Sequence, residues 1–199
     1  MRLSFGMRGV APWRKLDPNR MVGVQSVSSS ALPILSRSAR VMALLGLQYH
    51  RPFHRDSVFL FFLALGPVVW LSLIWVFAFQ PLPRHAIWSP VFLSIVLWQP
   101  LFEELLFRGM VQGHLLQSLA RQKTWFGLST SNLLTSFLFS LAHLASHSIP
   151  WSLLVFAPSL CFGFVRDRFG SVYPSIALHA FYNAGYFLLI DGVTLPNSF

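Results

Sequence analysis

Long apolar runs separated by short polar connectors make up the chain from residue 57 onward. Residues 57–79 contain no charged side chain and are rich in Phe, Leu and Trp. As a helix this run would be about 35 Å long, enough to cross a hydrocarbon core of roughly 30 Å. Two prolines in residues 80–85 cannot continue the helical hydrogen bonding. The pattern therefore predicts one membrane-spanning helix that ends near residue 79.

The next apolar run, residues 87–120, would be about 51 Å long as a straight helix, which is too long for one perpendicular span. Gln99-Pro100 is the natural break, leaving a short segment before it and a helix over residues 101–120. Later apolar runs predict helices at residues 125–144, at 149–165 with a kink at Pro158, and at 171–190. We therefore expect an all-α fold: a polytopic integral membrane bundle of about five to six helices.

The composition agrees with a membrane protein and excludes a soluble globule of this size. Hydrophobic residues make up 54% of the 199 positions and charged residues only 11%. The mean hydropathy is +0.58. Such a chain has too little polar surface to cover a water-soluble domain. Cys161 is the only cysteine, so no internal disulfide is possible, and its apolar neighbours predict a buried thiol.

The net charge of +9 is concentrated at the N-terminus. Residues 1–55 hold nine Lys or Arg against one acid, Asp17. We expect residues 1–48 to be a basic, disordered cytoplasmic arm that contacts anionic headgroups, with a short interfacial helix at 41–47. Residues 49–199 would form the helical membrane domain. Because the basic charge follows membrane topology, we expect no nucleic-acid partner and a cytoplasmic N-terminus.

This topology leaves a conflict of depth between two polar residues. It places Glu103 towards the cytoplasmic side of its helix and His143 near the outer end of the helix at 125–144. A chain break at Pro100 is expected to bring the two residues to one level.

Two adjacent glutamates, Glu103 and Glu104, are the only glutamates in the chain and lie inside an apolar run. Ionisable groups in a membrane segment are costly unless they are paired or used. In a helix Glu104 and Arg108 are four residues apart and share a face, so they can form an ion pair. Glu103 lies about 100° further round the helix. The spacing therefore predicts that Glu103 is unpaired and free for a substrate or a water molecule.

Two further pairs of residues four apart lie on separate predicted helices. His143 follows Phe139, and His179 precedes Asn183. Either pair alone is accounted for by a hydrogen bond between helices. Together with Glu103 they bring one acid, two histidines and one amide from three helices, which is typical of a catalytic site.

These residues resemble the three motifs of one family. Glu103-Glu104-Leu-Leu-Phe-Arg108, Phe139-Ser-Leu-Ala-His143 and His179-Ala-Phe-Tyr-Asn183 match the patterns EExxxR, FxxxH and HxxxN, in that order. They resemble the CAAX-protease and bacteriocin-processing (CPBP, or Abi) family of intramembrane endopeptidases, over roughly residues 86–190.

The resemblance implies a helical membrane protease in which activated water cleaves a peptide bond. Glu103 would be the general base, and His143 would bind or polarise the water. His179 and Asn183 would stabilise the tetrahedral oxyanion. Glu104, Arg108 and Phe139 would support the site. No metal cofactor is expected; the alternative is a Zn ion held by Glu103, His143 and His179.

The function expected on these grounds is an intramembrane endopeptidase of the bacterial inner membrane. Its substrate would be a membrane-anchored protein or peptide, cleaved near its C-terminus or its anchor within the lipid bilayer. The alternative is a non-catalytic immunity or scaffold protein that binds a peptide with the same fold. A transporter with a carboxylate proton relay is disfavoured because the chain shows no inverted repeat.

Overall fold

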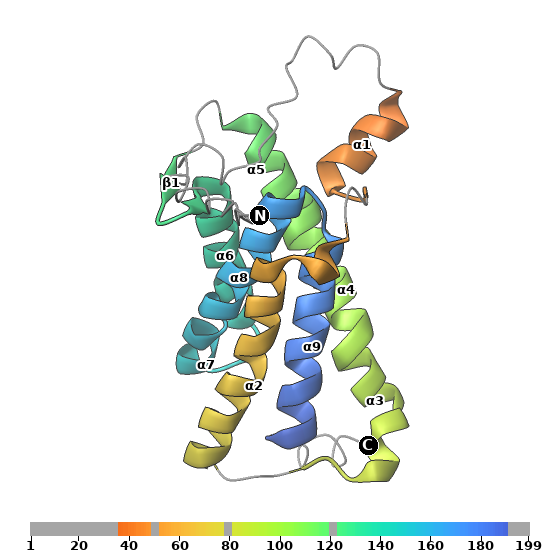
Figure 1. Ribbon diagram of the computed structural model, residues 1–199, viewed down its shortest axis with the longest axis vertical. Coiled ribbons are helices and arrows are strands. Elements are labelled where there is room, and N and C mark those ends of the chain that lie inside the picture. The colour runs from red at the N-terminus through yellow and green to blue at the C-terminus, as the bar shows by residue number, and fades with distance from the viewer. Residues whose placement is uncertain (1–35, 49–51, 78–80, 120–122, 191–199) are drawn as a thin grey trace, which may run out of the picture.

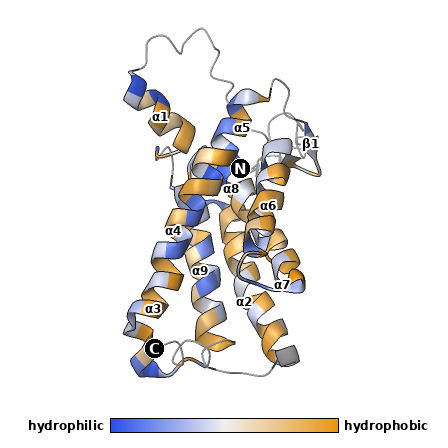
Figure 2. Cartoon of the chain, turned by 180° about the vertical axis from the view of Figure 1, so that it is seen from behind, coloured by the Kyte–Doolittle hydropathy of each residue, from blue (hydrophilic) through white to orange (hydrophobic). Residues whose placement is uncertain are grey.

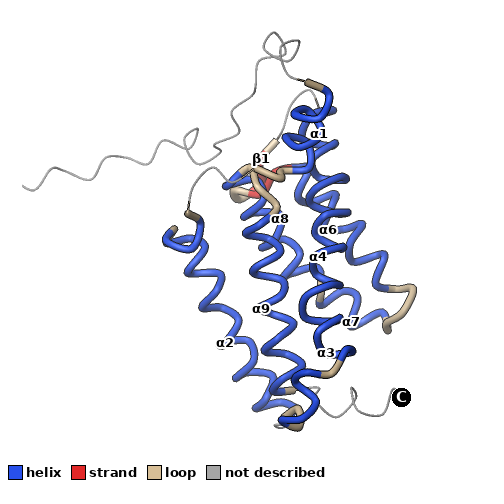
Figure 3. Tube along the Cα trace, turned by 90° about the vertical axis from the view of Figure 1, so that its right-hand side faces the viewer, coloured by secondary structure: helices blue, strands red, loops and turns tan. Residues whose placement is uncertain are grey.

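The computed structural model describes residues 36–48, 52–77, 81–119 and 123–190, and it is almost entirely helical. Figure 1 shows long helices that lie roughly along the vertical axis and alternate in direction along the chain, and the side view in Figure 3 shows the same alignment. The long elements are α2 (Ser57–Phe77), a continuous helix from Pro90 to Ser118, α6 (Thr130–His143), the pair α7 (Ile149–Leu154) and α8 (Phe156–Phe169), and α9 (Tyr173–Leu189). The shorter ones are the 3-10 turns Phe53–Arg55 and Arg84–Trp88 and the strands β1 (Thr124–Trp125) and β2 (Leu128–Ser129).

Three of these helices are long and apolar enough to cross a membrane: Ser57–Trp75, Pro90–Ser118 and Ile149–Phe169. The two others, α6 with 14 residues and α9 with 17, pack within the same bundle. The expected all-α membrane bundle is confirmed, with one addition. The chain also forms a two-stranded antiparallel hairpin that pairs Thr124 with Ser129.

The helix from Pro90 to Ser118 does not break at Pro100, so the break predicted there is wrong. It comprises α3 (Pro90–Leu93), a π-helical segment at Ser94–Trp98, α4 (Gln99–Glu104), a second π-helical segment at Leu105–Val111, and α5 (Gln112–Ser118). In a π-helical turn the carbonyl of residue i bonds to the N–H of residue i+5, and such turns occur as single irregular turns within α-helices. Pro100 is therefore accommodated directly after the first π segment.

The two π segments keep one face of this helix buried along its length. Every fourth residue is buried, in the series Phe92, Val96, Pro100, Glu104, Arg108 and Gln112. In a pure α-helix each fourth residue advances about 40°, so five steps would carry the series about 200° round the axis. Because a π turn holds more residues, the two π segments remove this drift. The face that is apolar at Phe92 and the face that carries Glu104 are thus the same face.

The helix expected over residues 125–144 is shorter than predicted. Residues 124–129 form the hairpin instead, with positive φ at Phe126 and Gly127 in its turn. The remaining α6 ends at His143, so that α6 and α7 cover only the upper part of the bundle in Figure 1. Glu103 lies near the middle of its 29-residue helix. The predicted conflict of depth is thus resolved by the short α6 and not by a break at Pro100.

A kink was expected at Pro158, and the helix is interrupted about one turn earlier in the chain. The interruption lies at Val155, between α7 and α8. Pro158 has no N–H to donate to the carbonyl of Leu154, so the regular bonding fails at that turn. The expected helix at 171–190 is confirmed as α9.

Part of the expected N-terminal arm is a docked helix, α1 (Arg37–Leu45), which overlaps the interfacial helix predicted at 41–47. Its C-terminal carbonyls lie against Gly113 and Gly109 of the long helix. Arg166 of α8 donates to the Leu44 carbonyl at 3.1 Å. The expected disorder of residues 1–35 lies outside the described residues.

Two apolar clusters hold the bundle together. One joins α2, α8 and α9 through Phe59, Phe162, Val165, Phe169 and Leu178. The other packs Leu82, Ala86, Phe92 and Val96 against the lower end of α9. In Figure 2, hydrophilic residues interrupt these apolar helices on α4 and α9 at about the same height. The functional candidates lie there.

Candidate active site

Glu104 is fully buried and held by two partners. Its Oε2 lies 3.2 Å from Arg108 Nε, one helical turn away on the same face. Its Oε1 lies 2.9 Å from Nδ1 of His179, which reaches across from α9. The expected Glu104–Arg108 pair is therefore present, but sequence spacing did not indicate the contact with His179. Both oxygens of Glu104 thus face partners inside the protein, and its full burial shields this carboxylate from a substrate.

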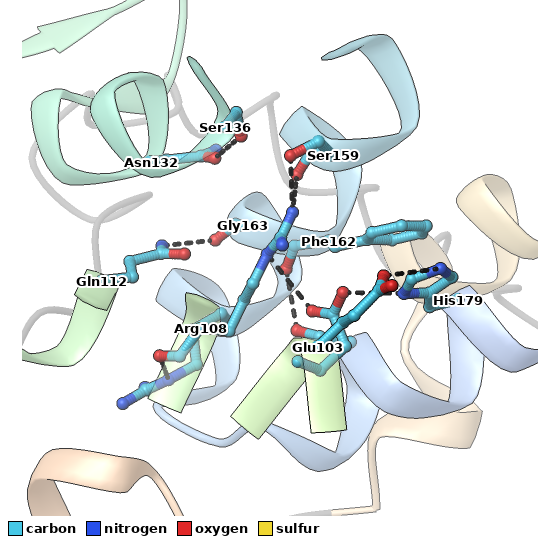
Figure 4. Close-up of polar contacts among 12 residues, drawn as sticks. Glu103, Arg108, Gln112, Asn132, Ser136, Ser159, Phe162, Gly163 and His179 are labelled. Carbon is cyan, nitrogen blue, oxygen red and sulfur yellow. Dashed lines mark hydrogen bonds and ion pairs between the residues drawn. The ribbon is translucent and has the colours of Figure 1, made fainter. Parts of the chain in front are cut away.

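Glu103 is the more accessible of the two glutamates, with 21% of its side chain exposed against 0% for Glu104. Its Oε1 accepts a hydrogen bond of 3.0 Å from Gln99 Nε2. Its Oε2 lies 3.8 Å from His179 Nε2, too far for a hydrogen bond. The prediction that Glu103 has no partner is thus wrong, because Gln99 orients it. Figure 4 shows the Glu103 side chain pointing towards the His179 ring.

His179 is positioned by Glu104 and by aromatic rings. The ring stacks on Phe162 at a centroid distance of 4.7 Å and meets the edge of Phe139 at 6.0 Å. A carboxylate only accepts hydrogen bonds, so the contact with Glu104 requires a proton on Nδ1. The other ring nitrogen, Nε2, is left facing Glu103.

Arg108 is buried in a shell that the sequence motifs only partly predicted. Its guanidinium lies over the rings of Phe139 at 4.6 Å and Phe162 at 5.5 Å. Nη2 donates to both the carbonyl and the hydroxyl of Ser159 on α8, at 2.9 and 2.6 Å. Phe139, which was expected to support the site, thus packs against Arg108, whereas the sequence did not indicate Ser159 or Phe162. Neither has a sequence signal beyond lying on an apolar helix.

A second layer of buried polar contacts continues from Arg108 along the same helix. Gln112, one turn further on, donates to the carbonyl of Gly163 at 2.9 Å and to Asp167 at 2.7 Å. Asn132 of α6 donates to the Leu160 carbonyl and accepts from Ser136. These residues were also missed. The spacing Glu104, Arg108, Gln112 is the signal that could have found Gln112, because it continues the buried four-residue series.

The two remaining candidates, His143 and Asn183, lie nearby but make other contacts. His143 is half-buried, and its Nδ1 lies 2.9 Å from the Phe139 carbonyl, which fixes a proton on that nitrogen. Both histidines contact the Phe139 ring, so they flank one aromatic side chain. Asn183 donates to the main-chain carbonyl of Ile95 at 3.0 Å.

The alternative metal set is not assembled among the described residues. Within them, no three His, Cys, Asp or Glu side chains lie close enough to hold an ion. Glu103 and His179 face each other, and each histidine uses its Nδ1 in a hydrogen bond, His143 to the Phe139 carbonyl and His179 to Glu104. The arrangement thus offers one partly exposed carboxylate opposite an imidazole, with a buried ion pair behind it.

These features agree with the comparison against known families. The model of the family "Type II CAAX prenyl endopeptidase Rce1-like" matches residues 83–185, just over half of the chain, and spans every candidate residue from Glu103 to Asn183. No curated protein and no solved structure matches the chain. The resemblance to CAAX proteases is thus confirmed, and the chain belongs to the Rce1-like type II CAAX prenyl endopeptidase family: it is a peptidase built into a helical membrane protein.

Proposed function

We propose that this peptidase hydrolyses a peptide bond with a water molecule activated by Glu103. The observation that carries the proposal is the unequal use of the two glutamates. Glu104 is fully buried and paired with Arg108 and His179, whereas Glu103 is partly exposed and faces His179 across a gap of 3.8 Å. A general base needs a carboxylate within reach of water, oriented by a neighbour. Gln99 supplies that orientation.

The reaction follows from these positions. Glu103 removes a proton from water as the oxygen attacks the carbonyl carbon of the substrate. The resulting oxyanion would be stabilised by the N–H of His179 Nε2, with Nδ1–H held by Glu104. This role requires both ring nitrogens to carry protons. When the peptide C–N bond breaks, Glu103 gives its proton to the leaving amine.

His143 and Asn183 would assist at either side of the reacting carbonyl. Because Nδ1 of His143 donates to the Phe139 carbonyl, Nε2 of the neutral ring carries a lone pair that can accept a hydrogen bond from the attacking water and so hold it in place. One N–H of the Asn183 amide is used by Ile95, and the second is available for the oxyanion. Arg108 and Phe139 hold the two histidines and Glu104 in place.

The surroundings of Glu103 favour a membrane-anchored protein or peptide as substrate. Its neighbours on the helix surface, Trp98, Phe102 and Leu106, are exposed by 56%, 64% and 47%. Large apolar side chains on the outside of a membrane helix face lipid. A substrate that arrives within the bilayer would therefore meet Glu103 from the lipid side, and we propose cleavage near its membrane anchor or C-terminus.

The charge distribution supports a cytoplasmic N-terminus in a bacterial inner membrane. Exposed cations at the end of the bundle that carries α1 include Arg37, Arg40, Arg55 and Lys123, whereas the opposite end, at the turn before α3, carries Arg84. Excess cations mark the cytoplasmic side of membrane proteins. We propose this orientation, with Glu103 near the middle of the membrane.

We propose further that catalysis needs no metal ion. The glutamate and water mechanism assigns a role to every motif residue without one. Cleavage should therefore continue after incubation with a chelator such as EDTA or 1,10-phenanthroline. Activity lost on chelation and restored by added Zn²⁺ would replace this mechanism with a metal-based one.

The test compares cells that carry the wild type or Glu103→Gln. The termini of membrane-associated proteins are read by mass spectrometry, so the substrate need not be identified in advance. Some protein termini will be produced by cleavage in the wild-type cells. We expect the amount of these termini to be lower by about 100-fold or more in the variant, because a general base contributes that much to the rate. Asp56→Asn, the same acid-to-amide change outside the site, should leave them unchanged. If Glu103→Gln produces the same termini as the wild type, Glu103 is not the base.

A further inference from the structure

The carbonyl of Ile95 has lost both of its usual backbone donors. In an α-helix it would accept from the N–H of residue 99, but that N–H of Gln99 donates to the Ser94 carbonyl, in the π pattern. In a continued π-helix it would accept from residue 100, and Pro100 has no N–H. A carbonyl left without a partner inside a membrane bundle costs several kcal/mol.

The side chain of Asn183 supplies the missing donor. Its Nδ2 lies 3.0 Å from the Ile95 oxygen and reaches across from α9, one turn after His179. The first π segment is therefore closed by a hydrogen bond from another helix. Proline and asparagine act as a pair here: the proline removes the backbone donor and the asparagine replaces it.

This closure affects the glutamates because the π segment sets the rotation of the helix that follows. Ser94–Trp98 directly precedes α4, which carries Glu103 and Glu104. Without the π segment, the buried series of every fourth residue would drift round the axis, as it does in a regular α-helix. Glu104 would then turn away from His179, and Gln99 would move together with Glu103.

We propose that Asn183 is a positioning residue: it holds the π turn at Ser94–Trp98 through the Ile95 carbonyl and thereby fixes the rotation of Glu103 and Glu104 towards His179. The inference rests on the proposed function, in which Glu103 activates the water. This role is an alternative to direct stabilisation of the oxyanion by the second N–H of Asn183, because the effect passes through the backbone and a backbone change can replace the side chain.

The experiment uses Pro100→Ala to restore the missing N–H. Four full-length proteins are compared: wild type, Asn183→Ala, Pro100→Ala and the double variant. Mass spectrometry measures the amount of the protein termini that the wild type produces by cleavage. This amount is divided by the amount of folded protein in the membrane, measured by size-exclusion chromatography in detergent, to give cleavage per folded molecule. We expect Asn183→Ala to lose about tenfold in cleavage per folded molecule, the effect of one hydrogen bond to a buried acceptor.

The double variant decides between the two roles. If Asn183 acts by position, the backbone N–H restored at position 100 serves Ile95, and cleavage returns to within about threefold of the wild type. If the double variant folds but is as inactive as Asn183→Ala, or if Asn183→Ala retains full cleavage per folded molecule, the proposal is overturned. Should Asn183→Ala fail to fold, a folded and active double variant supports positioning, and a folded but inactive one refutes it.

The outcome is separable from that of the proposed function. Glu103→Gln tests the base with Asn183 intact. The rescue by Pro100→Ala tests the positioning with Glu103 intact. Loss of cleavage in Glu103→Gln together with failure of rescue would leave the base assigned and refute only the role of Asn183.

Discussion

The two halves of the long helix bury the same face with opposite chemistry. Before Pro100 the buried positions are Phe92 and Val96, which pack in an apolar cluster with the lower end of α9. After Pro100 they are Glu104, Arg108 and Gln112, each fully buried and bound to side chains or carbonyls of α8 and α9. The same four-residue spacing of buried positions therefore builds an apolar core in the first half and the candidate active site in the second.

The two halves differ in how well they tolerate substitutions. An apolar half tolerates small errors of packing, because its contacts are many and individually weak. A polar half in a membrane does not, since each missing partner leaves a buried group uncompensated. Two buried nitrogens of Arg108, Nε and Nη1, already have no hydrogen-bond acceptor among the described residues, and Nε has only its ion-pair contact with Glu104. The polar half should thus be the less tolerant of substitution.

The largest effect is expected from Glu104→Ala. It leaves the Arg108 guanidinium buried without its carboxylate, and breaking a buried pair costs about 3–5 kcal/mol of unfolding free energy. The yield of folded protein should fall, as measured by size-exclusion chromatography. Cleavage should fall as well, as measured by mass spectrometry of protein termini.

A double variant sharpens this prediction by making the second half resemble the first. Glu104→Leu with Arg108→Met replaces the pair by apolar groups of similar size, which is often neutral for stability. We expect folding to recover and cleavage to stay absent, because His179 has lost its orienting carboxylate. A well-folded, active Glu104→Ala protein would contradict the support role.

A medium effect is expected from Gly163→Ala, at the contact between α8 and α6. A Cβ there would overlap the Asn132 side chain, which binds the Leu160 carbonyl and Ser136. Overpacking of this kind costs about 1–3 kcal/mol. The matched control is Gly109→Ala, whose added carbon would lie 3.4 Å from the Leu45 oxygen, an ordinary contact. Thermal unfolding in detergent should separate the two variants, and equal melting temperatures would contradict the packing seen at Gly163.

The smallest effect is expected at the surface pair of Asp56 and Arg168. The hydrogen bonds from Arg168, at 3.1 and 2.9 Å, are the main cause that lowers the pKa of Asp56 below its usual 3.8. A lowered pKa stabilises the folded state above about pH 4, and this stabilisation is lost as the pH falls through the folded pKa.

The matching variant is Asp56→Asn, which keeps an acceptor for the backbone N–H groups of Val58 and Phe59 at the start of α2. It should lower the unfolding free energy at pH 7 by about 0.5–1 kcal/mol or less, as for other surface pairs. The difference from wild type should shrink when unfolding is measured near pH 3. A difference that is unchanged by pH would mean that the charge of Asp56 contributes nothing.

Hydropathy and helical spacing determined the fold class and much of the site. Uncharged runs must become helices in a bilayer, because every backbone group needs an internal partner there. This fixed α2 and α9 to within a few residues. The four-residue spacing of Glu104 and Arg108 was enough to predict their pair, because both residues lie on one helix and their relation is local.

The tertiary structure alone decided which partners come from other helices. Nothing in the spacing of Glu104 indicates His179, and nothing in Asn183 indicates the Ile95 carbonyl, since each contact depends on how α9 lies against the long helix. The continuity of that helix through Pro100 was likewise decided by packing: a local rule predicted a break, and a π turn closed by a distant amide prevented it. Local rules describe one helix at a time, whereas buried polar groups in a membrane are satisfied by whichever helix is near.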